Sequence, residues 1–137
     1  MDEALHKPES MKIIIADDFY TNRLLVSEIL KDLGHELIEA ENGKEALEAL
    51  MNNNDVDLVL MDIEMPVMGG LEAIKYIREK LVYPKNQVPI IALTAHNPRM
   101  FPEDSNHNGF DGFLVKPYSI HKIAEILETF RKKHVNI

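Results

Sequence analysis

The stretch formed by residues 57–66 constrains the fold more than any other part of this sequence. An unbroken apolar run, residues 58–61, leads directly into the carboxylate of Asp62, and a Met65-Pro66 break follows. Apolar runs of this length are typical of strands covered on both faces, as in the parallel sheets of α/β proteins. Asp62 would then end a buried strand, where open α/β sheets bind ligands. An aspartate there can also be a plain turn former, so the rest of the chain has to decide.

Five strand-like runs alternate with helix-like stretches along the whole chain. β-branched and apolar residues predict strands at residues 12–16, 36–40, 58–62, 90–94 and 112–115. Apolar residues at helical spacing predict helices at residues 19–33, 43–51, 71–80 and 119–134. The first should bury Leu25, Ile29 and Leu33, and the last should bury Ile120, Ile123, Leu127 and Phe130. The segment 95–108 contains Pro98 and Pro102 and predicts at best a short, irregular fourth helix.

This alternation predicts an α/β fold in which a five-stranded parallel sheet carries helices on both faces. We expect a doubly wound (βα)5 sheet of flavodoxin-like order 2-1-3-4-5, with a crevice between the first and third strands. At 137 residues the chain fits one domain. We assign residues 11–134 to that domain and residues 1–10 to a mobile N-terminal tail.

Polar side chains stand at the ends of four predicted strands. Asp17-Asp18 follow the first strand, Asp62 ends the third, Thr94 ends the fourth and Lys116 follows the fifth. Because the carboxyl ends of parallel strands meet at one edge of a sheet, these side chains should share one crevice. Three carboxylates packed together repel each other unless a cation lies among them. A hard cation such as Mg²⁺ (or Mn²⁺) takes such oxygen ligands.

This set of residues fits phosphoryl transfer. Mg²⁺ and Lys116 would neutralise the phosphoryl oxygens, Thr94 would hold one of them, and an aspartate would accept the group. Each residue also has an ordinary explanation: Asp17-Asp18 could cap a helix, Thr94 could simply end a strand, and Lys116 could be a solvated charge. Those explanations do not account for all of these residues falling at one sheet edge.

With these motifs the chain resembles a response-regulator receiver domain of the CheY-like family, from residue 12 to about residue 133. The match rests on Asp17-Asp18, on Met-Asp-Ile-Glu-Met-Pro at 61–66 with Gly70, on residues 93–95, and on Lys116-Pro117. Residues 22–23 and 94–96 resemble receivers of hybrid kinases in particular. The resemblance implies a two-component or phosphorelay signalling domain, a phosphoprotein switched by an aspartyl phosphate.

The resemblance also implies roles around a metal. Asp62 would accept the phosphoryl group from a phosphohistidine on a sensor histidine kinase or a histidine phosphotransfer protein. Asp18, Asp62 and the backbone carbonyl of Glu64 would bind Mg²⁺ directly, while Asp17 would act through water. Lys116 would contact the phosphoryl oxygens.

Further positions are implied to switch and tune the domain. Thr94 and Phe113 would move together and change the face made by the fourth helix, fifth strand and fifth helix, where a downstream protein would bind. Glu64 and His96 stand where the family tunes phosphoryl lifetime, although His96 could equally be a solvated loop residue. The chain departs from many relatives in having Phe113 in place of Tyr, Gly69 in place of Asp, and a poor fourth helix.

Other functions compete with a phosphorylatable receiver. A phosphorylation-independent binding scaffold of the same fold would be expected to lack a site residue, and none is missing. A Mg²⁺-dependent phosphatase of the haloacid-dehalogenase type needs an Asp-x-Asp pair, which residues 62–64 imitate only loosely. An FMN protein would carry hydroxyls and amides where this chain has Asp17-Asp18, and no Gly-x-x-x-x-Gly-Lys nucleotide loop is present.

Composition limits where the domain acts and what it binds. A net charge of −8 disfavours direct binding to nucleic acid or anionic lipid. There is no cysteine and no apolar run of membrane-spanning length, so we expect a cytoplasmic domain without membrane insertion.

The domain would catalyse its own phosphorylation and dephosphorylation at Asp62 rather than act on a small-molecule substrate. We expect a stand-alone protein, with an excised domain of a larger hybrid kinase as the rival.

Overall fold

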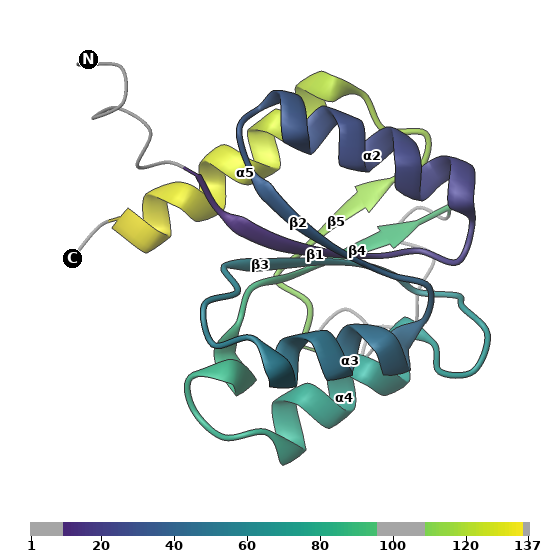
Figure 1. Ribbon diagram of the computed structural model, residues 1–137, viewed down its shortest axis with the longest axis vertical. Coiled ribbons are helices and arrows are strands. Elements are labelled where there is room, and N and C mark those ends of the chain that lie inside the picture. Colours follow the sequence, from purple (N-terminus) through teal and green to yellow (C-terminus); the bar gives the residue numbers. More distant parts are fainter. Residues whose placement is uncertain (1–9, 96–108, 136–137) are drawn as a thin grey trace.

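A five-stranded parallel sheet forms the middle layer of the computed structural model (Figure 1), which describes residues 10–95 and 109–135 and, in the last helix, side chains as far as Arg131. The strands are β1 (Lys12–Ala16), β2 (Glu36–Ala40), β3 (Leu58–Asp62), β4 (Ile90–Thr94) and β5 (Gly112–Val115). Their order is β2-β1-β3-β4-β5, and all neighbours run parallel. The predicted fold class and strand order are confirmed.

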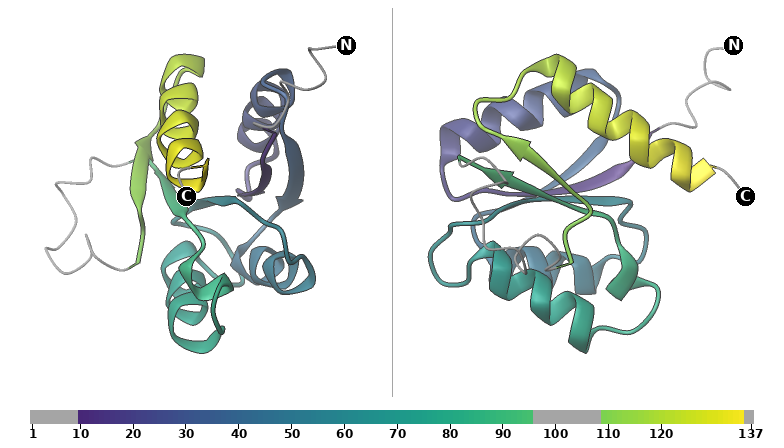
Figure 2. Two further views of the ribbon diagram at one scale, coloured as in Figure 1. Left: turned by 90° about the vertical axis from the view of Figure 1, so that its left-hand side faces the viewer. Right: turned by 180° about the vertical axis from the view of Figure 1, so that it is seen from behind.

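Helices cover both faces of this sheet. Helices α2 (Tyr20–Asp32) and α5 (Ile120–Val135) lie on one face, and α3 (Gly43–Asn52) and α4 (Gly70–Lys80) lie on the other (Figures 1 and 2). A short 3-10 helix, η1 (Lys85–Gln87), precedes β4. Asn42 caps α3 because its side chain accepts a hydrogen bond from the Glu45 N–H.

The sheet divides the hydrophobic core into two clusters. Successive residues of β1 point to opposite faces, so Ile13 and Ile15 pack under α2 and α5, while Ile14 packs under α3 and α4. Every residue of β3 and β4 is buried, which explains why their sequences read as continuous apolar runs. Full burial of each such isoleucine or leucine contributes about 1.5–3 kcal/mol to folding.

Two predicted buried faces are wrong in part. Leu25 and Leu33 of the first helix region are exposed, and the buried residues of α2 are Arg23, Val26, Ser27, Ile29 and Leu30. The buried face of α2 contains two polar residues, Arg23 and Ser27. A search for apolar residues alone therefore selects the neighbouring face, which carries Leu25 and Leu33. Ile120 is exposed as well, because it begins α5 beyond the end of β5, whereas Ile123, Leu127 and Phe130 are buried as predicted.

Three predictions lie outside the described residues. They are the mobile tail (apart from residue 10), the irregular fourth helix within residues 95–108, and the position of His96. Within the parts of the chain that the structure describes, no helix is long and apolar enough to span a membrane.

Candidate functional site

The carboxyl edge of the sheet, where the strands end, carries a pocket of about 290 Å³. The side chains of Asp62, Thr94 and Lys116 come to this pocket from the ends of β3, β4 and β5, and Asp18 comes from the loop after β1. Its complete lining is Asp18, Phe19, Asn22, Asp62, Ile63, Glu64, Thr94, Ala95 and Lys116. Four of the five residues predicted to share a crevice therefore line one pocket.

Asp17 completes a cluster of three carboxylates with Asp18 and Asp62. One oxygen from each lies within 4.8 Å of the others. Asp17 is fully buried, and burial raises the pKa of its carboxyl group above the ordinary value. The Phe19 N–H, which donates to Asp17 Oδ1 over 2.9 Å, and the charge of Lys116 both oppose this rise in pKa. Three carboxylates at this spacing form a strongly negative site.

Lys116 is the cation that faces this cluster. Its Nζ donates to Asp62 Oδ2 over 2.9 Å and lies 3.7 Å from Asp17 Oδ2. Asp62 Oδ1 accepts a longer bond, 3.2 Å, from the Glu64 N–H. A backbone hydrogen bond fixes the position of Lys116: its N–H donates to the carbonyl of Thr94 over 2.7 Å. The end of β5 is thus joined to the end of β4 directly beside Asp62.

The loop after Asp62 is shaped by a glycine that has no room for a side chain. The Gly70 N–H donates to the Ile63 carbonyl over 2.8 Å. A Cβ at Gly70 would lie 2.3 Å from the Asp62 carbonyl oxygen, closer than any real contact. This close approach folds residues 63–69 back over the end of β3. It thereby keeps Glu64 at the mouth of the pocket.

The geometry fits a hard divalent cation. Asp17 Oδ2 is buried and accepts no hydrogen bond from any of the described residues, although Lys116 lies 3.7 Å away. A buried carboxylate oxygen without a donor is costly unless a cation compensates its charge. Three carboxylates within 4.8 Å offer the all-oxygen ligand set that Mg²⁺ prefers.

A model of the response regulator receiver domain matches residues 13–128. The chain belongs to the response-regulator receiver family. This receiver is 34% identical over 119 residues to a chemotaxis protein CheY homolog of Campylobacter jejuni, covering 86% of this chain and 90% of that protein. It is 33% identical over 143 residues to Histidine kinase 5 of Arabidopsis thaliana, covering 87% of this chain but 15% of the kinase.

Among solved structures, the receiver resembles the receiver domain of the sensor histidine kinase PA1611 of Pseudomonas aeruginosa PAO1. The TM-score is 0.78 and the identity 27%, over 89% of this chain and 98% of that domain. That crystal structure contains a magnesium ion coordinated in the active-site cleft. The family and fold implied by the sequence motifs are therefore confirmed, and this chain is a receiver domain of the two-component type.

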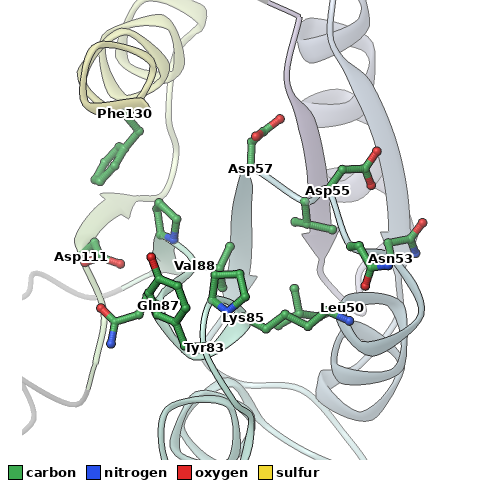
Figure 3. Close-up of a pocket in the computed structure, with 14 residues that line it drawn as sticks. Leu50, Asn53, Asp55, Asp57, Tyr83, Lys85, Gln87, Val88, Asp111 and Phe130 are labelled. Carbon is green, nitrogen blue, oxygen red and sulfur yellow. The ribbon is translucent and has the colours of Figure 1, made fainter. Parts of the chain in front are cut away.

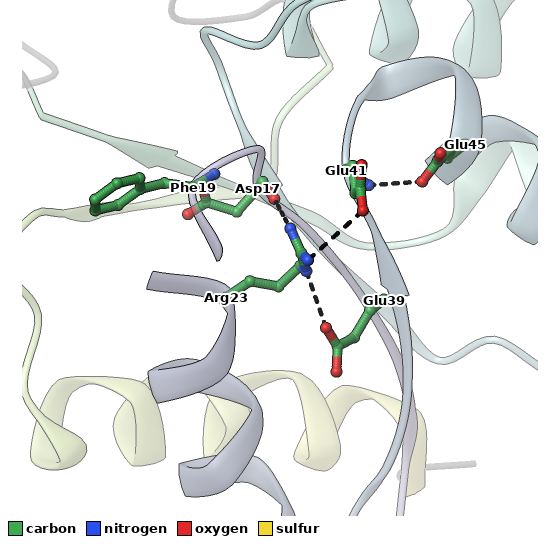
Figure 4. A network of polar contacts seen from close by, with 6 residues as sticks. All are labelled: Asp17, Phe19, Arg23, Glu39, Glu41 and Glu45. Atoms are coloured by element: carbon green, nitrogen blue, oxygen red, sulfur yellow. Dashed lines mark hydrogen bonds and ion pairs between the residues drawn. The ribbon is translucent and has the colours of Figure 1, made fainter. Parts of the chain in front are cut away.

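Two further residues near the site have no role in the sequence-based prediction. Tyr118 packs against the core under α2 and α5, and its hydroxyl is buried without a hydrogen-bond partner in the described part of the chain. Burial, followed by the charges of Asp17 and Asp62, raises the pKa of this phenol above its ordinary value. Arg23 is buried beside the loop that carries Asp17 (Figure 4). The helical spacing of Arg23 with Val26, Ser27 and Leu30 is the one sequence feature that indicates its burial.

A larger cavity of about 640 Å³ lies at the opposite, amino edge of the sheet, where the strands begin (Figure 3). It is lined in part by Asp55, Asp57 and Asp111. These carboxylates already have partners: Asp57 and Asp111 accept bonds from strand backbone, and Asp55 pairs with Lys12 at 3.0 Å. The cluster of three carboxylates, by contrast, lies at the carboxyl edge beside the smaller pocket.

Proposed function

We propose that this receiver accepts a phosphoryl group on Asp62 from a phosphohistidine of a sensor histidine kinase or a histidine phosphotransfer protein. The observation that carries the proposal is the position of the Asp62 carboxylate. It lines the pocket, lies within the three-carboxylate cluster and has an ammonium group 2.9 Å from Oδ2. A carboxylate so placed is open to a donor and has a cation beside it for the incoming charge.

The transfer exchanges one bond to phosphorus for another. An oxygen of Asp62 forms a bond to phosphorus while the phosphorus–nitrogen bond of the phosphohistidine breaks. The bonding electron pair leaves with the imidazole nitrogen, which takes up a proton, and Asp62 becomes an acyl phosphate. Lys116 would move from its bond with Asp62 to the phosphoryl oxygens, whose negative charge it offsets.

Asp18, Asp62 and the backbone carbonyl of Glu64 would hold Mg²⁺ directly, and Asp17 would hold it through water. The cluster of the three carboxylates supports this assignment. When bound, the ion would neutralise the carboxylates and the phosphoryl oxygens. The magnesium in the active-site cleft of the PA1611 receiver supports this assignment.

The signal would leave the domain through Thr94 and Phe113. Thr94 is buried at the end of β4 and lines the pocket, so its hydroxyl could turn to a phosphoryl group on Asp62. Phe113 is half-buried on β5, and its ring centroid lies 5.9 Å from that of Phe110. A change in the packing of Thr94 and Phe113 would alter the face that includes β5 and α5, where a downstream protein would bind.

Glu64 and His96 would tune the lifetime of the phosphoryl group. The domain would act in the cytoplasm.

The test is direct chemical phosphorylation. The protein is incubated with saturating Mg²⁺ and acetyl phosphate, and intact mass with peptide mapping locates the adduct. We expect one phosphoryl group, on Asp62, and none in Asp62→Asn or when Mg²⁺ is chelated. Asp57→Asn is the matched control, because it changes an aspartate of the same strand region at the opposite sheet edge and keeps an acceptor for Lys12.

Two results would contradict the proposal. Absence of any adduct in the wild-type protein at saturating Mg²⁺ would favour a phosphorylation-independent binding scaffold. Continuous release of phosphate from many phosphate monoesters would favour a Mg²⁺-dependent phosphatase.

A further inference from the structure

The side chain of Arg23 is buried at the start of α2 and joins three parts of the fold (Figure 4). Its Nη1 donates to the backbone carbonyl of Asp17 over 2.7 Å. Its Nε donates to Glu39 Oε1, at the end of β2, over 2.9 Å. Nη2 lies 3.9 Å from Glu41 Oε2, and the ring of Tyr20 lies 5.5 Å from the guanidinium carbon. The guanidinium thus spans α2, the loop after β1 and the end of β2.

The bond to the Asp17 carbonyl bears directly on Asp18. That carbonyl belongs to the peptide group that links the two aspartates, and a peptide group is planar. Fixing the direction of the carbonyl therefore fixes the direction of the Asp18 N–H and restricts where the Asp18 side chain can point. Asp18 is exposed, and no packing in the core holds it in place.

The same loop is held at two further points. The Asp17 N–H donates to the Ala40 carbonyl over 3.1 Å, and the Asp17 carboxylate accepts from the Phe19 N–H. The donors in these two contacts are backbone N–H groups. The donor from Arg23 is a charged side chain, which is also bonded to Glu39 of β2. The guanidinium donates from two different nitrogens, Nη1 to Asp17 and Nε to Glu39, whereas an ammonium group has a single donating nitrogen and cannot reproduce this geometry.

We propose that Arg23 is a positioning residue for the carboxylate cluster: it orients the Asp17–Asp18 peptide so that Asp18 meets Asp17 and Asp62 in one cation site. The inference rests on the proposed function, because it assigns Arg23 to the Mg²⁺ site of that function. Arg23 touches neither the metal nor the phosphoryl group. Its effect should therefore appear in metal affinity and in the order of the loop, and be small once the site is saturated with metal.

The principal variant is Arg23→Met, which keeps much of the buried stem and removes all donors. We expect its dissociation constant for Mg²⁺, measured by isothermal titration calorimetry, to rise about tenfold, the size of effect typical for residues that support metal ligands. The rate of phosphorylation by acetyl phosphate should fall at low Mg²⁺ and return to within about twofold of wild type at saturating Mg²⁺. In the metal-free protein, amide hydrogen exchange at Phe19 should accelerate more than exchange at Val59 in β3.

Two further variants control for loss of stability. Arg78→Met removes a comparable guanidinium from α4, where Arg78 donates to the carbonyls of Gly109 and Asn86 near the amino edge. It should leave Mg²⁺ affinity unchanged. Arg23→Lys keeps the charge but has one donating nitrogen in place of the two that reach Asp17 and Glu39, so its Mg²⁺ affinity should lie between those of Arg23→Met and wild type. If circular dichroism shows that Arg23→Met does not fold, Arg23→Lys replaces it as the test variant.

The outcomes separate this inference from the function on which it rests. If folded Arg23→Met, or in its place Arg23→Lys, binds Mg²⁺ as wild type does, Arg23 only stabilises the fold. Equal losses of affinity in Arg23→Met and Arg78→Met lead to the same conclusion. If the wild-type protein itself shows neither a Mg²⁺ titration nor an Asp62 adduct, the proposed function fails, whereas metal-free exchange at Phe19 still reports whether Arg23 orders the loop.

Discussion

At the amino edge of the sheet two aspartates each exchange a pair of hydrogen bonds with the backbone of a neighbouring strand. The Asp57 N–H donates to the Lys12 carbonyl and Asp57 Oδ2 accepts from the Lys12 N–H, at 2.8 and 2.9 Å. Asp111 and Ile90 do the same at 2.7 and 2.8 Å. At the carboxyl edge, Asp17 Oδ2 accepts no hydrogen bond from the residues described. Aspartates at opposite edges of the same sheet thus differ in how fully their carboxylate oxygens are hydrogen-bonded.

The difference separates aspartates that hold the sheet together from those that would bind a ligand in the proposed function. A satisfied carboxylate at a strand start supplies an acceptor to a backbone N–H that would otherwise lack one, and so stabilises the fold. A cluster of crowded carboxylates lowers stability until a cation joins it. The chain carries both kinds of aspartate, and substitutions can show that they are independent.

The largest expected effect is the loss of the cation at the carboxyl edge. Lys116→Gln removes the ammonium 2.9 Å from Asp62, and we expect acetyl phosphate to modify Asp62 about 10²–10³-fold more slowly at saturating Mg²⁺. Lys85→Gln is the matched change at the amino edge, where Lys85 Nζ donates to the Met51 carbonyl, and it should leave the rate unchanged. Equal rates in wild type and Lys116→Gln would remove Lys116 from the proposed transfer.

Substitution of one aspartate at each edge should change stability in opposite directions. Asp57→Ala leaves the Lys12 N–H without its side-chain acceptor and should lower the free energy of unfolding by about 1–3 kcal/mol.

Asp17→Asn removes a buried negative charge and keeps an oxygen for the Phe19 N–H, so it should raise the stability of the metal-free protein. Urea denaturation in the presence of a chelator measures both. A loss of stability in Asp17→Asn would show that its charge is already compensated without metal.

The smallest effect is a pH dependence that originates at the amino edge. His35 is buried, and its Nδ1 accepts a bond of 3.0 Å from the Met11 N–H, which a protonated Nδ1 cannot do. Burial, helped by Arg131 and opposed by Asp57, lowers the pKa of His35 below 6.5. The unfolded chain therefore binds the proton more tightly, and stability conferred above pH 6.5 is lost as the pH falls through the lowered pKa.

The slope from this one group cannot exceed about 1.4 kcal/mol per pH unit. Comparison of wild type with His35→Gln by urea denaturation between pH 5 and 7.5, a range chosen to bracket an ordinary histidine pKa of about 6.5, isolates it. Identical pH slopes in the two proteins would show that His35 is protonated equally in the folded and unfolded chains.

The fold and the position of most candidate-site residues were predictable because both follow from short-range patterns. Apolar runs such as residues 58–61 mark the buried strands, and Asp62, Thr94 and Lys116 stand at strand ends that a parallel sheet must bring to one edge. Arg23 and Tyr118 were not predictable in the same way. Their burial depends on partners from other elements, namely Glu39 for Arg23 and the core under α2 and α5 for Tyr118.

The same limit explains the errors in the helices. A stripe that contains Arg23 and Ser27 does not look apolar, so periodicity predicts the apolar Leu25 and Leu33 in the interior although they face solvent. Ile120 has the right spacing for the core, but it lies past the end of β5, where the sheet no longer covers it. Periodicity gives the direction of a side chain and not the extent of the surface it meets.

The buried, unsatisfied oxygen of Asp17 has a consequence for protein engineering. A library of this domain selected only for heat resistance, without metal, should enrich replacements that remove charge from the carboxyl edge, since each relieves repulsion there. Such a selection should leave Asp57 and Asp111 intact, because they stabilise the sheet. Thermostable clones would then keep the receiver fold and lose the proposed acceptor chemistry, so a useful screen has to demand phosphorylation together with survival.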